Sequence, residues 1–208
     1  MTTTIILVRH CHHNLIRRVL VGREPNVSLS AIGMRQAQRL AAVLVRRGVA
    51  DVKSSPQLRA RQTAEPIAAL LGKPVEIMAE FDEADFGAWS GRAFELLQND
   101  CHWQRWNSDR EACRPPGGET MRELQSRVLA GLSRLAKAHP GQCIAVVTHA
   151  EPARAAALHY RGIPLGEFAR VEIDPGSCTT LKFEGEHGAI VSGYTHAEAM
   201  IFRQAAEA

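Results

Sequence analysis

The chain lacks the features that mark several large classes of protein. Its 208 residues contain no apolar run near the roughly 20 residues that a membrane-spanning helix needs. The amino terminus, MTTTIILVRH, has neither a basic leader nor a cleavage site. The net charge is only +3, so no basic surface is expected to hold nucleic acid. These absences predict a cytoplasmic protein with neither a membrane nor a nucleic-acid partner.

Organised cysteine is also missing. The five cysteines are odd in number, are spread along the chain, and include no C-x-x-C pair. A structural zinc site and a disulfide framework are therefore both disfavoured, and reduced thiols fit the cytoplasm. No internal repeat or low-complexity segment is present. With 45% hydrophobic and 23% charged residues, the chain can bury a substantial core, and its length predicts a single domain over residues 1–208.

Short apolar runs alternate with helical periodicity in the first part of the chain. The run TTIILVR is β-branched and long enough for a strand buried on both faces, but too short for an independent helix. Ser30 can cap the helix that follows, and Gly48 can end it. The expected elements, in order, are a strand at 3–9, a helix at 30–47, a strand at 49–55, a helix at 57–72 and a strand at 74–78.

The pattern loosens between residues 81 and 118, a segment that contains all three tryptophans. We interpret this segment as a cap-like insertion with one or two helices, in which at least two tryptophans serve core packing. Regular alternation then resumes. The expected elements are a helix from Thr120, a strand at 143–149, a helix at 152–161, and strands near 168–174, 178–184 and 189–193. If the strand at 178–184 lies at a sheet edge, it is a candidate for pairing across a homodimer.

Alternating apolar strands and helices indicate an α/β fold, a three-layer α/β/α sandwich around a mostly parallel central sheet. In such sheets, ligands bind at the carboxyl ends of the strands. Two of the expected strands end in histidine, in VRHCHH and in VVTHAEP. We therefore expect His10 and His149 to face the same crevice.

Several motifs together resemble the histidine phosphatase superfamily, which has the phosphoglycerate mutase-like fold, along nearly the whole chain. The pair Arg9-His10 after an apolar strand is similar to the Arg-His-Gly signature of the family, and LSAIGMRQA matches the stretch that follows it. The other matching stretches are SSPQLRARQTA (54–64), DEADFGAWSG (82–91), GGET (117–120) and VVTHAEPARA (146–155). The occurrence of these motifs in order and at matching intervals makes the resemblance specific.

The resemblance implies a metal-independent phosphatase without a cofactor, which hydrolyses phosphate monoesters through a phosphohistidine. His10 is then the nucleophile, because a neutral imidazole can attack phosphorus. Arg9 and Arg59 bind the phosphate dianion, since guanidinium offers a planar fork of donors. His149 stabilises the charge on the transferring oxygens. Glu83 protonates the leaving alkoxide and later activates the hydrolytic water.

Two of these assigned residues have neighbours that carry the same functional group. Asp82 and Asp85 lie beside Glu83, and the E-x-x-F-G spacing of the family favours Glu83. Arg61 lies two residues beyond Arg59, and on one helix these positions differ by about 200° around the axis, so both cannot point into one pocket. The family pattern selects Arg59.

The chain departs from the family at two positions. Cys11 stands where the family usually has glycine; we expect its side chain to point away from the ligand, with a redox-sensitive thiol as the alternative. Ile16 stands where the family often has a phosphate-binding asparagine. Asn14 is our predicted substitute for that phosphate ligand, with His13 as the alternative.

Other functions remain open beside hydrolysis of a small phosphorylated substrate. One is mutase-type phosphoryl transfer as in phosphoglycerate mutases, although the chain is shorter than cofactor-dependent mutases and lacks a clear sign of their longer insertion. Another is a catalytically weak protein that binds a phosphate ligand. A metal site in HCHH is disfavoured, because adjacent residues of an extended chain point to opposite sides and form a poor tetrahedral set.

Overall fold

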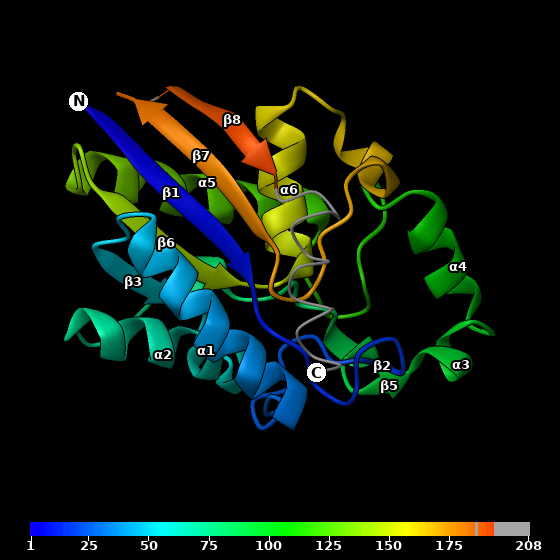
Figure 1. The fold of residues 1–208 in the computed structure, drawn as a ribbon. Helices are drawn as coiled ribbons and strands as arrows, with labels where there is room; N and C mark the ends of the chain where they lie inside the picture. The colour runs from blue at the N-terminus through cyan, green and yellow to red at the C-terminus, as the bar shows by residue number, and fades with distance from the viewer. Residues whose placement is uncertain (186, 194–208) are drawn as a thin grey trace.

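A six-stranded sheet forms the centre of the computed structural model, which describes residues 1–185 and 187–193 (Figure 1). Its strand order is β4-β3-β6-β1-β7-β8. The strands are β1 (Thr2–Arg9), β3 (Asp51–Ser54), β4 (Glu76–Ile77), β6 (Cys143–Thr148), β7 (Cys178–Glu184) and β8 (His187–Gly193). The four strands from β4 to β1 pair in parallel, and β7 and β8 add antiparallel pairs. The predicted mostly parallel sheet is confirmed.

Helices cover both faces of this sheet. The helices α1 (Ala31–Arg46) and α2 (Leu58–Leu71) lie on one face, and α5 (Met121–Ala138) and α6 (Ala150–Tyr160) lie on the other (Figure 1). Side chains of β1 alternate between the two layers, as the period of a strand requires. Ile6 and Val8 join the α1–α2 core, whereas Ile5 and Leu7 join the α5–α6 core. This is the expected three-layer sandwich.

The predicted helix ends coincide with local capping groups. The Ser30 hydroxyl accepts a hydrogen bond from Gly33 N and begins α1. Thr120 and Glu123 form a reciprocal capping box at the start of α5. Gly72 ends α2 in the left-handed conformation that glycine adopts at low cost. No helix within residues 1–185 is long and apolar enough to cross a membrane.

The 81–118 segment packs at the carboxyl-terminal side of the sheet. It holds the 3-10 turn Gly87–Trp89, the helices α3 (Phe94–Leu97) and α4 (Cys101–Ser108), and β5 (Arg92–Ala93), which pairs with β2 (Val19–Leu20). The three tryptophans are all buried and contact one another through their rings. Their cluster includes residues of α6, so the predicted packing role of the tryptophans is confirmed.

Two expectations for the carboxyl-terminal region are wrong. Residues 168–174 do not form a strand; a 3-10 helix at Leu165–Arg170 leads into irregular backbone. The carbonyls of Val171 and Ile173 accept hydrogen bonds from arginine side chains, so neither carbonyl is available for a sheet ladder. The strand at 178–184 exists as β7, but it lies between β1 and β8 and is not a sheet edge. It therefore cannot pair across a dimer in the way proposed from the sequence.

Candidate active site

Three adjacent parallel strands deliver polar side chains to one place. β3, β6 and β1 end immediately before Ser55, His149 and His10. Strand register keeps the three together: Arg9 pairs with Thr148, and the amide of His10 donates to the Thr148 carbonyl at 2.9 Å. The amide of Ser55 donates to the Val147 carbonyl at 2.9 Å. The predicted meeting of the two histidines is confirmed, with ring centroids 5.1 Å apart.

His10 has one ring nitrogen fixed and the other available. Its Nδ1 lies 2.9 Å from the Cys11 carbonyl oxygen. A carbonyl can only accept a hydrogen bond, so Nδ1 carries the proton and Nε2 carries the lone pair. Burial, and then the charges of Arg9 and Arg59, hold the pKa of His10 well below its usual range. The imidazole is therefore neutral near pH 7 and has the tautomer that a nitrogen nucleophile needs at Nε2.

Backbone carbonyls anchor the guanidinium groups of Arg9 and Arg59, and Arg59 uses both terminal nitrogens, since its Nη1 also donates to the Glu24 carbonyl at 3.2 Å. Arg9 Nη1 donates to the Ile173 carbonyl at 2.6 Å, and Arg59 Nη2 donates to the Gly22 carbonyl at 2.6 Å. Both side chains line the same pocket as His10. The Nε groups of both arginines are buried, and neither has a hydrogen-bond partner within the part of the chain described. Buried donors without partners are costly, and two guanidinium charges at one pocket favour an anion there.

His149 is fully buried behind His10 and connects to a carboxylate. Its Nε2 lies 2.7 Å from the Ser55 hydroxyl, which donates to Asp82 Oδ1 at 3.1 Å. Because the serine proton is directed at the carboxylate, the hydroxyl oxygen accepts from Nε2–H. Burial and the charge of Arg59 hold the pKa of His149 well below its usual range. Its Nδ1 is buried and has no hydrogen-bond partner among the described residues.

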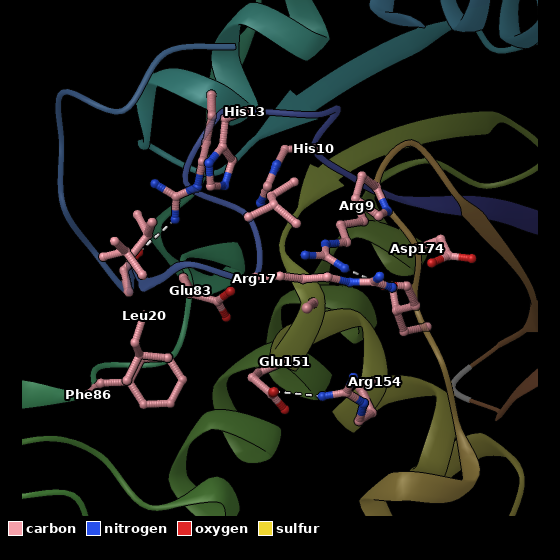
Figure 2. A pocket seen from close by; sticks show the side chains of 18 of the residues that line it. Arg9, His10, His13, Arg17, Leu20, Glu83, Phe86, Glu151, Arg154 and Asp174 are labelled. Carbon is pink, nitrogen blue, oxygen red and sulfur yellow. Dashed lines mark hydrogen bonds and ion pairs between the residues drawn. The ribbon is translucent and has the colours of Figure 1, made fainter. Parts of the chain in front are cut away.

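Glu83 is the predicted acid, and it also lies in the pocket lining (Figure 2). Burial, and then the nearby Glu151 carboxylate, raise the pKa of Glu83 to about 7. Its Oε1 accepts from the Ala84 amide at 2.8 Å. The main chain of Glu83 is held separately, because its carbonyl accepts from Arg23 Nε and from Arg127 Nη2, both at 2.9 Å. These two arginines were not predicted from the sequence.

Two glycines allow the loop that carries Glu83 to contact the turn before α5. A Cβ on Gly118 would lie 2.2 Å from the Asp85 carbonyl oxygen, and a Cβ on Gly87 would lie 2.1 Å from the Pro116 carbonyl oxygen. Any larger residue would separate the two backbones. The contact brings Glu119 next to the loop that carries Glu83, where its carboxylate accepts hydrogen bonds from Arg23 and Arg127. This contact explains the second glycine of the GGET motif, Gly118.

The pocket measures about 310 Å³ and has two unlike walls. One wall is apolar and includes Leu20 and Phe86 (Figure 2), and Ile16 is a further apolar residue of the lining. The other wall is charged; its members are Arg17, Glu151, Arg154, Glu172 and Asp174. Protein ligand pockets commonly run from about 300 to 1,000 Å³, so this one suits a small ligand.

The charged wall includes a carboxylate with two cationic partners. Glu151 Oε1 accepts from Arg154 Nη1 at 2.6 Å and from Arg110 Nη1 at 3.1 Å. Burial opposes ionisation of this group, but the two arginines together hold the pKa of Glu151 below its ordinary value. Glu151 therefore stays charged inside the pocket.

The structure brings together five of the six residues predicted for the site. Arg9, His10, Arg59 and Glu83 line the pocket, and His149 contacts His10 from behind. The expectation that Asn14 lines the pocket is wrong. It sits in a turn, its side chain is exposed, and it does not belong to the lining.

Neighbouring residues clarify the alternatives left by the sequence. His13, the alternative to Asn14, is buried and does line the pocket. Arg61 is exposed and does not belong to the lining, whereas Arg59 does. Cys11 lies in the α1–α2 core, outside the pocket lining, and burial raises the pKa of its thiol to about 12. Cys11 thus lies outside the ligand space, and its burial and raised pKa disfavour a reactive thiol there.

Ser55 and Asp82 were the other site residues that the sequence analysis missed. Ser55 could have been found, because it directly follows a strand that is parallel to the two histidine-bearing strands. Asp82 was treated only as a competitor of Glu83, yet it supports His149 through Ser55. Arg127 lies mid-helix and gives no local signal of its role.

Comparison with known proteins agrees with this geometry. The family model of the histidine phosphatase superfamily (branch 1) matches residues 5–195. Phosphoserine phosphatase 1 of Hydrogenobacter thermophilus is 31% identical over 193 residues, covering 90% of each chain. The bifunctional protein Rv2228c of Mycobacterium tuberculosis is 31% identical over 91% of this chain but 52% of its own length. The chain thus spans about half the length of the curated relatives it first matches.

Solved structures show the same fold. The alpha-ribazole phosphatase of Shigella flexneri superposes with a TM-score of 0.81 at 25% identity, covering 92% of this chain and 96% of that chain. YhfR of Bacillus stearothermophilus superposes with a TM-score of 0.84 at 23% identity, covering 91% and 95%. The chain belongs to the histidine phosphatase superfamily.

Proposed function

We propose that the protein is a metal-independent phosphatase that hydrolyses small phosphate monoesters through a phosphohistidine on His10. The observation that carries this proposal is a neutral His10 with its Nε2 lone pair available, in one pocket with two buried arginines whose Nε donors lack partners. These donors suit a dianion, and the lone pair suits attack on its phosphorus. Relatives named as phosphatases support hydrolysis as the reaction class.

In the first step, His10 Nε2 forms a bond to phosphorus as the bond to the ester oxygen breaks. Arg9 and Arg59 hold the non-bridging oxygens, which carry the negative charge. Glu83 is largely protonated below its pKa of about 7 and gives its proton to the leaving oxygen. The products of this step are the free alcohol, the phosphohistidine and the Glu83 carboxylate.

In the second step, the Glu83 carboxylate takes a proton from a water molecule that attacks the phosphohistidine. The N–P bond breaks, inorganic phosphate forms, and Glu83 is again protonated. His149 would assist both steps. A bound phosphoryl dianion favours a proton on Nδ1 of His149, and the Asp82 carboxylate supports that charge through Ser55.

The walls of the pocket favour a particular kind of leaving group. The size of the pocket suits a small organic portion, the apolar wall suits a hydrocarbon face, and the charged wall suits a polar end. We also propose a cytoplasmic location, where cysteines without pairing motifs stay reduced.

Trapping of the phosphoenzyme during the first turnover, followed by a test of its acid lability, examines the mechanism directly. The protein is mixed with a radiolabelled small phosphoester in EDTA and quenched within the first turnover, and the label bound to protein is measured before and after mild acid. We expect an acid-labile phosphoenzyme and steady hydrolysis in EDTA. His10→Ala should lose both signals, whereas the matched control His159→Ala removes an exposed histidine and should keep both.

Three results would contradict the proposal. Turnover by His10→Ala at the wild-type rate would exclude His10 as the nucleophile. Complete loss of activity in EDTA, restored by a divalent cation, would exclude metal independence. Exchange of phosphate between positions of a phosphorylated sugar acid with little release would identify a mutase instead.

A further inference from the structure

His13 is a buried pocket residue to which the proposed reaction assigns no task. Only 4% of its surface is exposed, and it lines the pocket together with His10 and Arg59. Its ring centroid lies 5.1 Å from that of His10, with the planes inclined by 34°. Figure 2 shows the two rings side by side at the same end of the pocket. A side chain in this position can touch whatever group His10 attacks.

The hydrogen bonding of His13 fixes where its proton lies. The Leu15 amide donates to His13 Nδ1 at 3.3 Å, so Nδ1 carries a lone pair and the proton of the neutral ring is on Nε2. Burial, and then the charges of Arg59 and Arg9, lower the pKa of His13 to about 4. The ring is therefore neutral near pH 7. Its Nε2–H has no hydrogen-bond partner among the described residues.

No other side chain of this turn can supply a neutral donor to the pocket. Asn14 is exposed and outside the lining, Leu15 is apolar, and Ile16 lines the pocket with an apolar side chain. The other donors near His10 are the guanidinium groups of Arg9 and Arg59. A cation at position 13 would add to their charge, whereas a neutral N–H adds a hydrogen bond without further opposing the positive charge that the His10 ring gains when its Nε2 is phosphorylated.

We propose that His13 is a substrate-contacting residue whose Nε2–H donates a hydrogen bond to a phosphoryl oxygen on the His10 side of the pocket. The inference deepens the proposed phosphatase function and rests on it for the identity of the bound group. It assigns a hydrogen-bond contact and involves no covalent step. Its ligand chemistry is a phosphoryl group in the ground state and during transfer.

Two variants separate the two roles of His13, which are donation of a hydrogen bond by Nε2 and acceptance of the Leu15 amide by Nδ1. His13→Asn keeps an acceptor at the place of Nδ1 for the Leu15 amide, but its amide is too short to reach where Nε2 lies. His13→Gln has the opposite effect, since its side-chain amide reaches the place of Nε2 but leaves Leu15 without its acceptor. His12→Asn is the matched control, because His12 lies outside the pocket lining and its Nδ1 contacts Ser30.

The measurements are kcat, KM and the inhibition constants of orthovanadate and inorganic phosphate. Loss of one neutral hydrogen bond to a buried partner predicts that His13→Asn weakens both inhibitors and lowers kcat/KM by about 10- to 100-fold. His13→Gln should stay within about fivefold of the wild type if the donor is what matters. His12→Asn should match the wild type in every constant.

The outcomes separate the role of His13 from the proposed function. If His13→Asn keeps wild-type inhibitor affinity, or if both variants lose affinity equally, the hydrogen-bond assignment is wrong and the ring only fills the pocket. If the wild type binds inorganic phosphate with the expected pattern among variants but turns over no phosphoester, the His13 contact stands and the phosphatase proposal fails. If the wild type hydrolyses phosphoesters and the variants match it, only the His13 inference fails.

Discussion

Replacing Glu83 with glutamine should remove activity and increase stability above neutral pH. The carboxyl is buried in the pocket, and its pKa is raised to about 7 from an ordinary value of 4.5. Between these two pH values, the native group keeps its proton while the unfolded chain has released it. The unfolded state then binds fewer protons, so the stability of the wild type falls as the pH rises through this interval.

The size of the effect follows from the interval between the two pKa values. The rise of the pKa from 4.5 in the unfolded chain to about 7 in the native protein corresponds to about 3 kcal/mol of stability, which is present at low pH and lost by pH 8. The Glu83→Gln amide resembles the neutral carboxyl and can still accept from the Ala84 amide, a hydrogen bond of 2.8 Å in the wild type. The variant should therefore equal the wild type within about 1 kcal/mol at pH 5 and exceed it by about 3 kcal/mol at pH 8.

Urea denaturation of both proteins at pH 5 and at pH 8 measures this difference. Glu95→Gln is the control, since Glu95 is an exposed carboxylate, and its effect on stability should be the same at both pH values. Turnover of an alkyl phosphoester by Glu83→Gln should fall by about 10²- to 10⁴-fold, the usual contribution of a general acid. A variant that gains no stability at pH 8 would refute the argument that burial keeps Glu83 neutral.

Two further predictions concern residues that support the site. Cys11 is fully buried, and its amide donates to the Thr63 hydroxyl at 3.0 Å. An aromatic disulfide reagent should therefore modify the exposed Cys101 in the native protein, and Cys11 only after denaturation. Rapid native labelling of Cys11 would contradict its place in the core. Arg127→Met should destabilise the protein by about 2 to 4 kcal/mol, because it breaks a largely buried ion pair with Glu119. It should also lower kcat more than it raises KM, because it removes one anchor of the Glu83 carbonyl. An unchanged kcat would show that Arg23 alone holds the acid.

The parts of the site that the sequence predicted share a simple local cause. His10 and His149 follow apolar strands, and parallel strands end at the same edge of a sheet, so their meeting follows from periodicity and strand order. Arg59 was separable from Arg61 because their helical positions point in different directions. The 16 residues of α1 and the 18 residues of α5 were found from their spacing and caps.

The failures share a different cause, which is contact between distant segments. Residues 168–174 looked like a strand, but arginines from β1 and α6 bind their carbonyls. Asn14 and His13 are adjacent, and only the geometry of the turn decides that His13 faces inward. Arg127 reaches the Glu83 carbonyl across 44 positions of sequence, a distance at which no local pattern carries information.

The same pocket shifts the pKa values of two buried glutamates in opposite directions, and the difference lies in their partners. Glu151 accepts hydrogen bonds from Arg110 and Arg154, which hold its pKa below the ordinary value despite burial. Glu83 forms no ion pair within the described residues. Arg23 and Arg127 bind its main-chain carbonyl, and their own contacts with the carboxylate of Glu119 offset their charges. These arginines therefore fix the position of the acid without strongly favouring its ionised form.

The charge of Glu151 then acts on Glu83 as the second cause, after burial, of its raised pKa. Arg110, which holds Glu151, lies beyond α4 and is stacked between the rings of Trp106 and Phe168, 4.1 and 3.6 Å from their centroids. The 81–118 segment thus does more than border the ligand space. By holding one carboxylate charged, it helps to keep the other protonated, which is the state that the proposed proton transfer to a leaving oxygen requires.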